Sequence, residues 1–263
     1  MNTLDPFNLF HLAGSGEMRN VTLALPIDAV RRLLPVGLLL GPQNITPPGT
    51  HPVILGFHTM HNLHTSVPSL LPPYSYFEHS VGIPHCYVSD PMLAPGSAGP
   101  YYFMPKLLVD NAWVALGGRL FWGFNKQLAA IQTSENGFAI CQANGSPIVS
   151  LWHKAVQEPR APLSVPEFTP QGEAISQCLI SLAPAGAGPL FLVAEFPKFW
   201  PQARLQPLET VVEIHSEYVP GLVPGRYPTD GRNYGIDQSI AGSYTLQAQF
   251  QVGCPCPPIC NLG

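Results

Sequence analysis

The residues with the clearest chemical potential lie between Gly117 and Leu128, where Lys126 closely follows Phe121, Trp122 and Phe124. Lys and Arg together number 12 in 263 residues, so a cation in an aromatic stretch is unusual. An ordinary lysine has a pKa of about 10.4 and is protonated at neutral pH, whereas desolvation favours the neutral amine. A neutral amine can attack a ketone, and the resulting iminium draws electrons from the adjacent bond. This chemistry permits decarboxylation, aldol-type cleavage or dehydration.

Lys126 also has simpler interpretations. On a short helix over Lys126 to Ile131, its side chain would lie on the surface with the aliphatic stem along Trp122. The ammonium would then stay solvated and protonated. Alternatively, Lys126 lies in a pocket as a cation and acts as an electrostatic clamp or a proton donor. The residues alone leave these roles open.

Several short motifs precede or surround Lys126 in a fixed order: Asp110-Asn111, Ala112 to Leu116, Gly118-Arg119 and Trp122-Gly123-Phe124. This order resembles the signature of the acetoacetate decarboxylase family, in which Lys126 falls at the position of the Schiff-base lysine. The resemblance extends thinly over nearly the whole chain. Its outer parts are Ile27 to Val30 with Leu34-Pro35, similar to an early helix, Ile83-Pro84 after Glu78, and Ile240 to Tyr244, similar to the closing strand.

Three residues depart from the family pattern: Leu120 stands where Glu is usual, Asn125 where Pro is usual, and Gln127 where a second lysine is usual. The second lysine is a neighbouring cation, and like charges at low dielectric shift each other's pKa strongly. Without it, Lys126 must rely on desolvation by the nearby aromatic residues to lose its proton. The expected substrate is therefore not acetoacetate.

The resemblance implies further residues in the pocket. Glu78 matches a pocket glutamate that would orient the substrate or shuttle a proton; its alternative role is an exposed glutamate at the start of a strand. A second pocket acid aligns with Gly56 and is missing. Arg119 would either bind a carboxylate bidentately or form a structural salt bridge. The expected substrate-binding set is Arg19, His61, Tyr76, Arg119, Trp122, Phe124 and Gln127.

Two clusters of metal-ligating residue types occur, and we expect neither to bind a metal. His58, His61 and His64 would share one face of a helix, but on the strand that we expect here His61 points away from the other two. His61 is then either a proton carrier in the cavity or a hydrogen-bonded structural residue. The second cluster, Cys254, Cys256 and Cys260, lacks a usual zinc spacing and a nearby fourth ligand.

The composition excludes several classes of protein. A formal charge of -4 and a charged fraction of 11% provide no basic surface for nucleic acid. The chain has no apolar run of about 18 residues and no signal-peptide pattern, so we expect a cytoplasmic protein with no membrane partner. No phosphate loop, dinucleotide fingerprint or Gly-x-Ser-x-Gly turn occurs, and no cofactor is predicted. The expected partner is a small-molecule substrate, and the sequence admits a homo-oligomer.

The elements that must position these residues are mainly strands. The segment up to Gly16 is expected to be irregular, and Leu25 to Leu34 to form a short amphipathic helix that Pro35 ends. Apolar or alternating segments then predict strands at Val53–Phe57, Ser80–Val88, Tyr101–Val109, Trp113–Trp122, Gly137–Ala143, Ile148–His153, Leu190–Phe196, Glu209–His215 and Ser243–Val252. The fold prediction is mainly β, with a few short helices, in a single domain over residues 1–263. The resemblance implies a large, antiparallel, cone-like β-barrel with a central cavity.

Together these observations predict a cofactor-free lyase that acts on an apolar keto compound, a β-keto acid or a polyketide-like molecule. The Schiff base would form on Lys126, and Glu78 would assist proton transfer. Two alternatives stay open: a cyclase or isomerase that uses the same cavity without a covalent step, and a non-catalytic small-molecule-binding protein. The replacements Gly56, Leu120 and Gln127 are compatible with the last of these.

Overall fold

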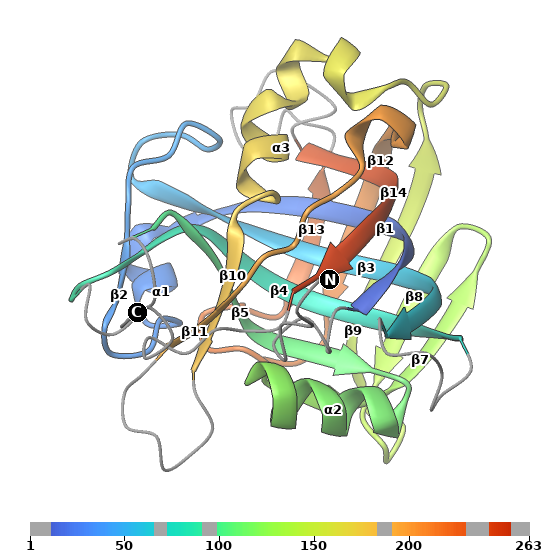
Figure 1. Ribbon diagram of the computed structural model, residues 1–263, viewed down its shortest axis with the longest axis horizontal. Helices are drawn as coiled ribbons and strands as arrows, with labels where there is room; N and C mark the ends of the chain where they lie inside the picture. Colours follow the sequence, from blue (N-terminus) through green and yellow to red (C-terminus); the bar gives the residue numbers. More distant parts are fainter. Residues whose placement is uncertain (1–11, 66–72, 91–98, 183–190, 230–241, 254–263) are drawn as a thin grey trace, which may run out of the picture.

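The computed structural model describes residues 12–65, 73–90, 99–182, 191–229 and 242–253. In these residues the protein is mainly β, as predicted, and its strands form one sheet of 14 strands (Figure 1). Eleven of them follow one another in hydrogen-bonded order: β11 (Phe191–Ala194), β10 (Cys178–Leu182), β5 (Tyr101–Val109), β4 (Tyr74–Val88), β3 (Thr50–Thr65), β1 (Leu12–Pro26), β14 (Ser243–Val252), β12 (Arg204–Ile214), β9 (Pro147–Ala155), β8 (Gly137–Cys141) and β7 (Ala130–Ser134).

Three further strands and a few short helices complete the described fold. The strands are β2 (Leu38–Leu40) beside β4, β6 (Lys126–Leu128) beside β5, and β13 (Gly225–Thr229) beside β12. The α-helices are α1 (Ile27–Arg31), α2 (Ala112–Trp122) and α3 (Thr169–Ala174), and short 3₁₀ turns cover Pro162–Ser164, Pro166–Phe168 and Trp200–Gln202. In Figure 1, α2 lies along one side of the molecule and α3 at the opposite side.

The structure differs from the predicted closed barrel. In the described residues the sheet ends at β11 on one side and at β7 on the other, and no pairing closes it into a barrel. The sheet is mostly antiparallel, but β5 pairs in parallel with both β10 and β6. Alternation in a sequence reports which face of a strand is buried, and it carries no information on whether the last strand returns to the first.

The centre of the sheet is buried on both faces. Along β1, Val21 and Leu23 belong to the core on one face, whereas Met18 belongs to the core on the other. The strand β14 alternates as predicted, with five buried apolar residues in the second core: Tyr244, Leu246, Ala248, Phe250 and Val252. This second core faces the cavity described below.

Residues 113–122, which the sequence predicts as a strand, form most of helix α2 instead. The side-chain oxygen of Asn111 accepts hydrogen bonds from the backbone N–H groups of Trp113 (3.0 Å) and Val114 (3.2 Å), which caps the helix. Gly123 ends it in the left-handed conformation, with a φ of 63°. The helical period is hidden in the sequence because apolar residues also occupy the outer face, where Leu120 is 60% exposed.

Three other segments differ from the prediction. Residues 126–131, considered as a short helix, form β6 and the start of β7, because β5 offers backbone partners to β6. The N-terminal segment is already a strand from Leu12, paired with both β14 and β3. The early helix is shorter than the range 25–34, since α1 covers only Ile27–Arg31.

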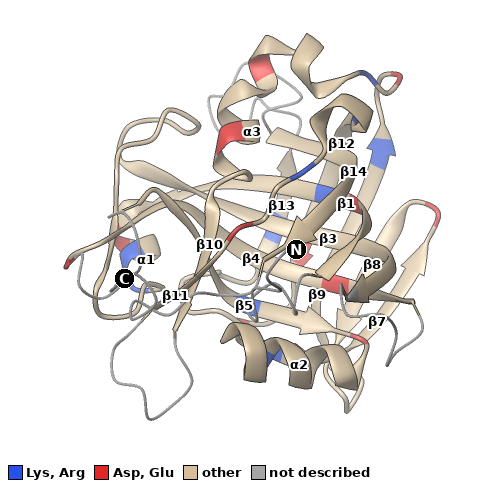
Figure 2. Ribbon diagram, in the orientation of Figure 1, with Lys and Arg blue, Asp and Glu red and all other residues tan. Residues whose placement is uncertain are grey.

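The surface carries few charges, and in Figure 2 the two signs are interspersed over the ribbon. Among the helices that the structure describes, none is both long and apolar enough to cross a membrane.

Replacing Asn111 with Ala should lower the free energy of unfolding by about 1 kcal/mol, because two N–H groups at the start of α2 lose their acceptor. Asn111→Ser keeps a capping oxygen and should stay within about 0.5 kcal/mol of the wild type. Urea unfolding followed by circular dichroism measures both variants. Equal losses in the two would contradict the capping role.

Candidate active site

A cavity lies between α2 and one face of the sheet. Its walls come from β1, β3, β4, β5, β6, β10, β14 and α2, together with the segments around Ile175 and Phe196. The free volume is about 140 Å³, close to that of a cavity that binds benzene. Most of the lining is apolar, and the charged residues in it are Glu78, Lys126 and Lys198.

Lys126 reaches this cavity from the first position of β6, which pairs with β5 in the register Leu107↔Lys126. Because side chains alternate along a strand, Lys126 is buried while Gln127 is exposed. Lys126 is 7% exposed, and its Nζ lies 2.7 Å from Oε2 of Glu78. The same Nζ lies 3.4 Å from the Tyr76 hydroxyl and 5.2 Å from the centre of that ring. The lysine is therefore inside the cavity and held by an ion pair.

Glu78, on β4, is the centre of this cluster and is 5% exposed. Its Oε2 also accepts a hydrogen bond from the Tyr76 hydroxyl at 3.3 Å, and its Oε1 lies 3.8 Å from Nδ1 of His58. Burial alone would raise the pKa of Glu78, but the Lys126 ammonium and the His58 side chain outweigh burial and lower the pKa to about 2. At neutral pH Glu78 is therefore a carboxylate, and its negative charge stabilises the Lys126 ammonium beside it.

Tyr76 supports the pair as a neutral donor. Burial, together with the charge of Glu78, raises the pKa of Tyr76 well above its ordinary value. The phenol thus keeps its proton and points it at the carboxylate. This leaves Glu78 with both an ammonium and a hydroxyl as donors in a mostly apolar surrounding.

His58 occupies the place where an acid was missing in the sequence comparison. Its Nε2 lies 3.3 Å from Oδ1 of Asn20. A Cβ atom on Gly56 would lie 2.2 Å from the same Nε2, so the glycine makes room for the imidazole. The residue opposite Glu78 on β3 is also His58. The position that lacks a carboxylate therefore allows a histidine next to Glu78 instead.

A glycine of α2 makes similar room for Lys126. A Cβ atom on Gly118 would lie 2.5 Å from Cδ of Lys126, closer than two such carbons can approach. Gly118 is buried, and the aliphatic stem of the lysine passes over it. Within the Gly118-Arg119 motif, the glycine thus allows α2 to pack close to the side chain of Lys126.

Some of the predicted substrate-binding residues line the cavity, and others lie outside it. Tyr76, Trp122 and Phe124 line the cavity. Gln127 lies outside, where its Oε1 accepts a hydrogen bond of 2.7 Å from Nζ of Lys106. Arg119 is also outside the lining, and its Nε donates to the carbonyl of Ala115 at 3.3 Å.

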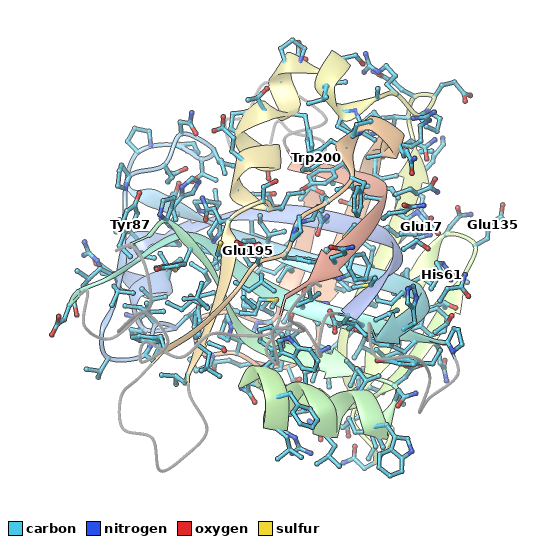
Figure 3. The ribbon with its side chains drawn as sticks, viewed as in Figure 1. Glu17, His61, Tyr87, Glu135, Glu195 and Trp200 are labelled. Atoms are coloured by element: carbon cyan, nitrogen blue, oxygen red, sulfur yellow. The ribbon has the colours of Figure 1, made fainter. Side chains whose placement is uncertain are left out.

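Arg19 and His61 do not line the cavity either. Arg19 pairs with Glu17 and lies over the ring of Phe138, 5.1 Å from its centre, next to the core on the other face of the sheet. His61 lies on β3 outside the lining, toward the right-hand edge of the molecule in Figure 3. His61, expected among the substrate-binding residues, therefore does not share the cavity with His58. The histidine that faces Glu78 is His58.

The prediction missed Lys198, which lines the same cavity. A signal was present: the segment from Phe196 to Trp200 contains three aromatic residues around this lysine, the same criterion that singled out Lys126. Among the described residues, no group of three or more His, Cys, Asp or Glu side chains could hold a metal ion. The cysteines Cys254, Cys256 and Cys260 lie outside the described residues.

The fold defined by this sheet and cavity is that of acetoacetate decarboxylase and related enzymes, which confirms the resemblance seen in the sequence at the level of fold. The chain is similar to an acetoacetate decarboxylase from Legionella pneumophila, with a TM-score of 0.61 and 14% identity over 94% of this chain and 86% of that one. It is also similar to an acetoacetate decarboxylase-like enzyme from Sphingomonas wittichii, with a TM-score of 0.60 and 15% identity over 95% and 93% of the two chains.

A third similar structure is the enduracididine biosynthesis enzyme MppR in complex with pyruvate, with a TM-score of 0.59 and 15% identity over 95% of this chain and 90% of that one. No protein-family model and no curated protein sequence matches the chain. At these identities the likeness defines the fold.

Gly118→Ala should destabilise the protein by about 1–3 kcal/mol, because the added methyl group overlaps the stem of Lys126. Gly117→Ala is the matched control in the same helix, since its methyl group meets Phe121 at 4.0 Å. That control should be neutral or stabilise by up to about 1 kcal/mol. Urea unfolding compares them, and a loss in Gly117→Ala as large as that in Gly118→Ala would refute the clearance argument.

Acid should destabilise the protein through Glu78. Its folded pKa of about 2 lies below the ordinary value of 4.5, so its contribution is present above pH 4.5 and is lost as the pH falls through about 2. The loss over that window is on the order of 3 kcal/mol. Urea unfolding at a series of pH values should show a shallower acid slope for Glu78→Gln than for the wild type.

The control for this measurement is Glu173→Gln, which changes an exposed carboxylate in α3 and should leave the slope unchanged. At pH 7, Glu78→Gln should be less stable by about 3–5 kcal/mol, since it leaves a buried ammonium without its partner. An acid slope in Glu78→Gln as steep as that of the wild type would rule out Glu78 as its source.

Proposed function

We propose that this protein is an acetoacetate decarboxylase-like enzyme that transforms a small keto acid through a Schiff base on Lys126. The observation that carries the proposal is the position of the Lys126 amine, buried in a mostly apolar cavity 2.7 Å from the Glu78 carboxylate. The shared fold supports it. Structures of MppR hold pyruvate, or the condensation product of pyruvate and imidazole 4-carboxaldehyde, so this fold accommodates a small keto acid.

The reaction begins with the ion pair. The Lys126 ammonium releases a proton to solvent water, because Glu78 with a pKa of about 2 is too weak a base to take it. The neutral Nζ then attacks the carbonyl carbon of the substrate. The carbonyl oxygen leaves as water, and a carbon–nitrogen double bond forms. In a decarboxylation, the bond to the carboxylate then breaks, carbon dioxide leaves, and its bonding electrons form an enamine. The enamine carbon takes a proton, and water hydrolyses the iminium to release the ketone and the free amine.

Glu78 and Tyr76 both lie next to Nζ of Lys126 and can assist these reaction steps. The Glu78 carboxylate, 2.7 Å from Nζ of Lys126, can stabilise the positive charge on that nitrogen in the resting ammonium and in the iminium. The Tyr76 hydroxyl, 3.4 Å from Nζ of Lys126, can donate to the departing carbonyl oxygen.

The size of the cavity favours small substrates. A free volume of about 140 Å³ suits a molecule of roughly benzene size, which corresponds to a short keto acid. The polyketide-like compounds of the sequence hypothesis are larger than this volume. Decarboxylation, aldol-type cleavage and dehydration all proceed through the same iminium, so the cavity size supports a small substrate but does not distinguish among these reactions.

The test is reductive trapping with a panel of short keto acids, including acetoacetate and pyruvate. Borohydride should reduce the iminium, and peptide mass mapping should find the adduct on Lys126. Lys126→Met should abolish the adduct and lower turnover by roughly 10³-fold or more. The control Lys154→Met removes an exposed lysine of β9 and should leave both unchanged.

Each of the other outcomes would indicate a different function for this protein. Turnover that survives Lys126→Met would refute the covalent mechanism and favour a cyclase or isomerase that uses the cavity alone. Tight binding without turnover of any compound would favour a binding protein. An adduct on a lysine other than Lys126 would refute the assignment of the nucleophile.

A further inference from the structure

A second lysine of the cavity, Lys198, is unused by the mechanism above. It follows β11, lines the cavity and is 9% exposed. Its Nζ donates a hydrogen bond to the carbonyl oxygen of Ile175 and lies 4.1 Å from the centre of the Phe196 ring. The bond to Ile175, at the C-terminal end of α3, uses one of the three N–H groups of the ammonium.

Lys198 differs from Lys126 in having no carboxylate partner among the described residues. The Glu78 carboxylate in the lining is paired with Lys126. The other titratable side chains in the lining are a histidine and tyrosines, which are neutral or cationic in their ordinary states: His58, Tyr74, Tyr76 and Tyr102. An ammonium in such a place has lost water and gained no counter-charge from the protein residues described.

This imbalance has a physical consequence. Burial lowers the pKa of Lys198 to about 7, so at neutral pH the amine takes up and releases a proton readily. An anion in the cavity would restore the missing charge and hold the proton in place. A single ammonium in a small, mostly apolar site suits one carboxylate, whereas a phosphate dianion requires several donors.

We propose that Lys198 is the carboxylate-binding residue of the cavity, which makes small monocarboxylic acids its ligands. Resting on the proposed function, this inference adds that the acid group of a keto acid sits at Lys198 while its carbonyl faces Lys126. The reaction class is then one in which the carboxylate anchors the substrate.

The experiment uses butyrate and its neutral amide, butyramide, which have the same carbon skeleton and no ketone. Neither can form a Schiff base, so their binding reports on Lys198 and not on the nucleophile. Isothermal titration calorimetry at pH 6.5 should show butyrate binding at least tenfold more tightly than butyramide. Equal affinities in the wild type would overturn the proposal without any variant being needed.

Two variants distinguish a role of the Lys198 charge in binding from a purely structural role of this side chain. Lys198→Met keeps a similar volume and should remove the preference for butyrate over butyramide. Lys198→Arg keeps a permanent charge and should retain that preference. If Lys198 only caps α3, Lys198→Met will be less stable but will keep the wild-type preference, and the proposal fails.

The pH dependence is a second readout. Butyrate is ionised above about pH 6, and the Lys198 ammonium is lost as the pH rises through about 7. Wild-type affinity for butyrate should therefore fall by about tenfold per pH unit above that point, while Lys198→Arg should bind with little change. Since His58, Glu78 and Lys126 face the same cavity, the comparison with Lys198→Arg isolates the contribution of Lys198. Parallel pH profiles in the two proteins would contradict the proposal.

The two proposals can fail separately. Loss of the Lys126 adduct with an intact butyrate preference would remove the Schiff-base reaction and leave the carboxylate site. An intact adduct with no butyrate preference would do the reverse.

Discussion

The buried ion pair between Lys126 and Glu78 is the interaction on which the rest of the site depends. Removing two charges from water costs several kcal/mol for each ion, and only close contact with additional donors offsets that cost. Here the contact is 2.7 Å, and Tyr76 supplies a further donor. The sheet makes the contact possible, since β4 and β6 flank β5 on opposite edges, with Glu78 opposite Val109 and Lys126 opposite Leu107. Strands at this spacing lie roughly 10 Å apart across the middle strand, a gap that a long lysine and a glutamate bridge together.

Hydrogen bonds at both ends of helix α2 hold it against the strands that line the cavity. Asp110 accepts a hydrogen bond of 2.9 Å from the backbone N–H of Phe77, which adjoins Glu78 on β4, and Asn111 caps the helix. At the other end, Trp122 donates to the carbonyl of Gly253, and its own carbonyl accepts from Ser181. The Asp-Asn pair that stands out in the sequence therefore has a structural task next to the candidate nucleophile.

Local patterns predicted the strands β5 and β14 well, because alternation or a continuous apolar run is visible within a few residues. They also placed Lys126 and Glu78 in one pocket, through the resemblance to decarboxylases. They failed for α2, whose cap and glycine stop were masked by apolar residues on its outer face. They also could not reveal His58 beside Glu78 or Lys198 inside the cavity. The position of His58 follows from pairing between β3 and β4. The aromatic residues around Lys198 are a signal in the sequence, but they do not show that its segment lies against the same cavity as Lys126.

Strand β6 has only three residues, and its register with β5 decides which of their side chains enters the cavity. Lys126 faces inward and Gln127 outward only because the three-residue strand meets β5 at Leu107. A slip of one position would present an amide to the cavity and an ammonium to solvent. One inserted or deleted residue between Gly123 and Lys126 could therefore inactivate the site while leaving both Lys126 and Glu78 in the protein. Within this fold, gain and loss of reactivity are open to changes in chain length as well as to substitution.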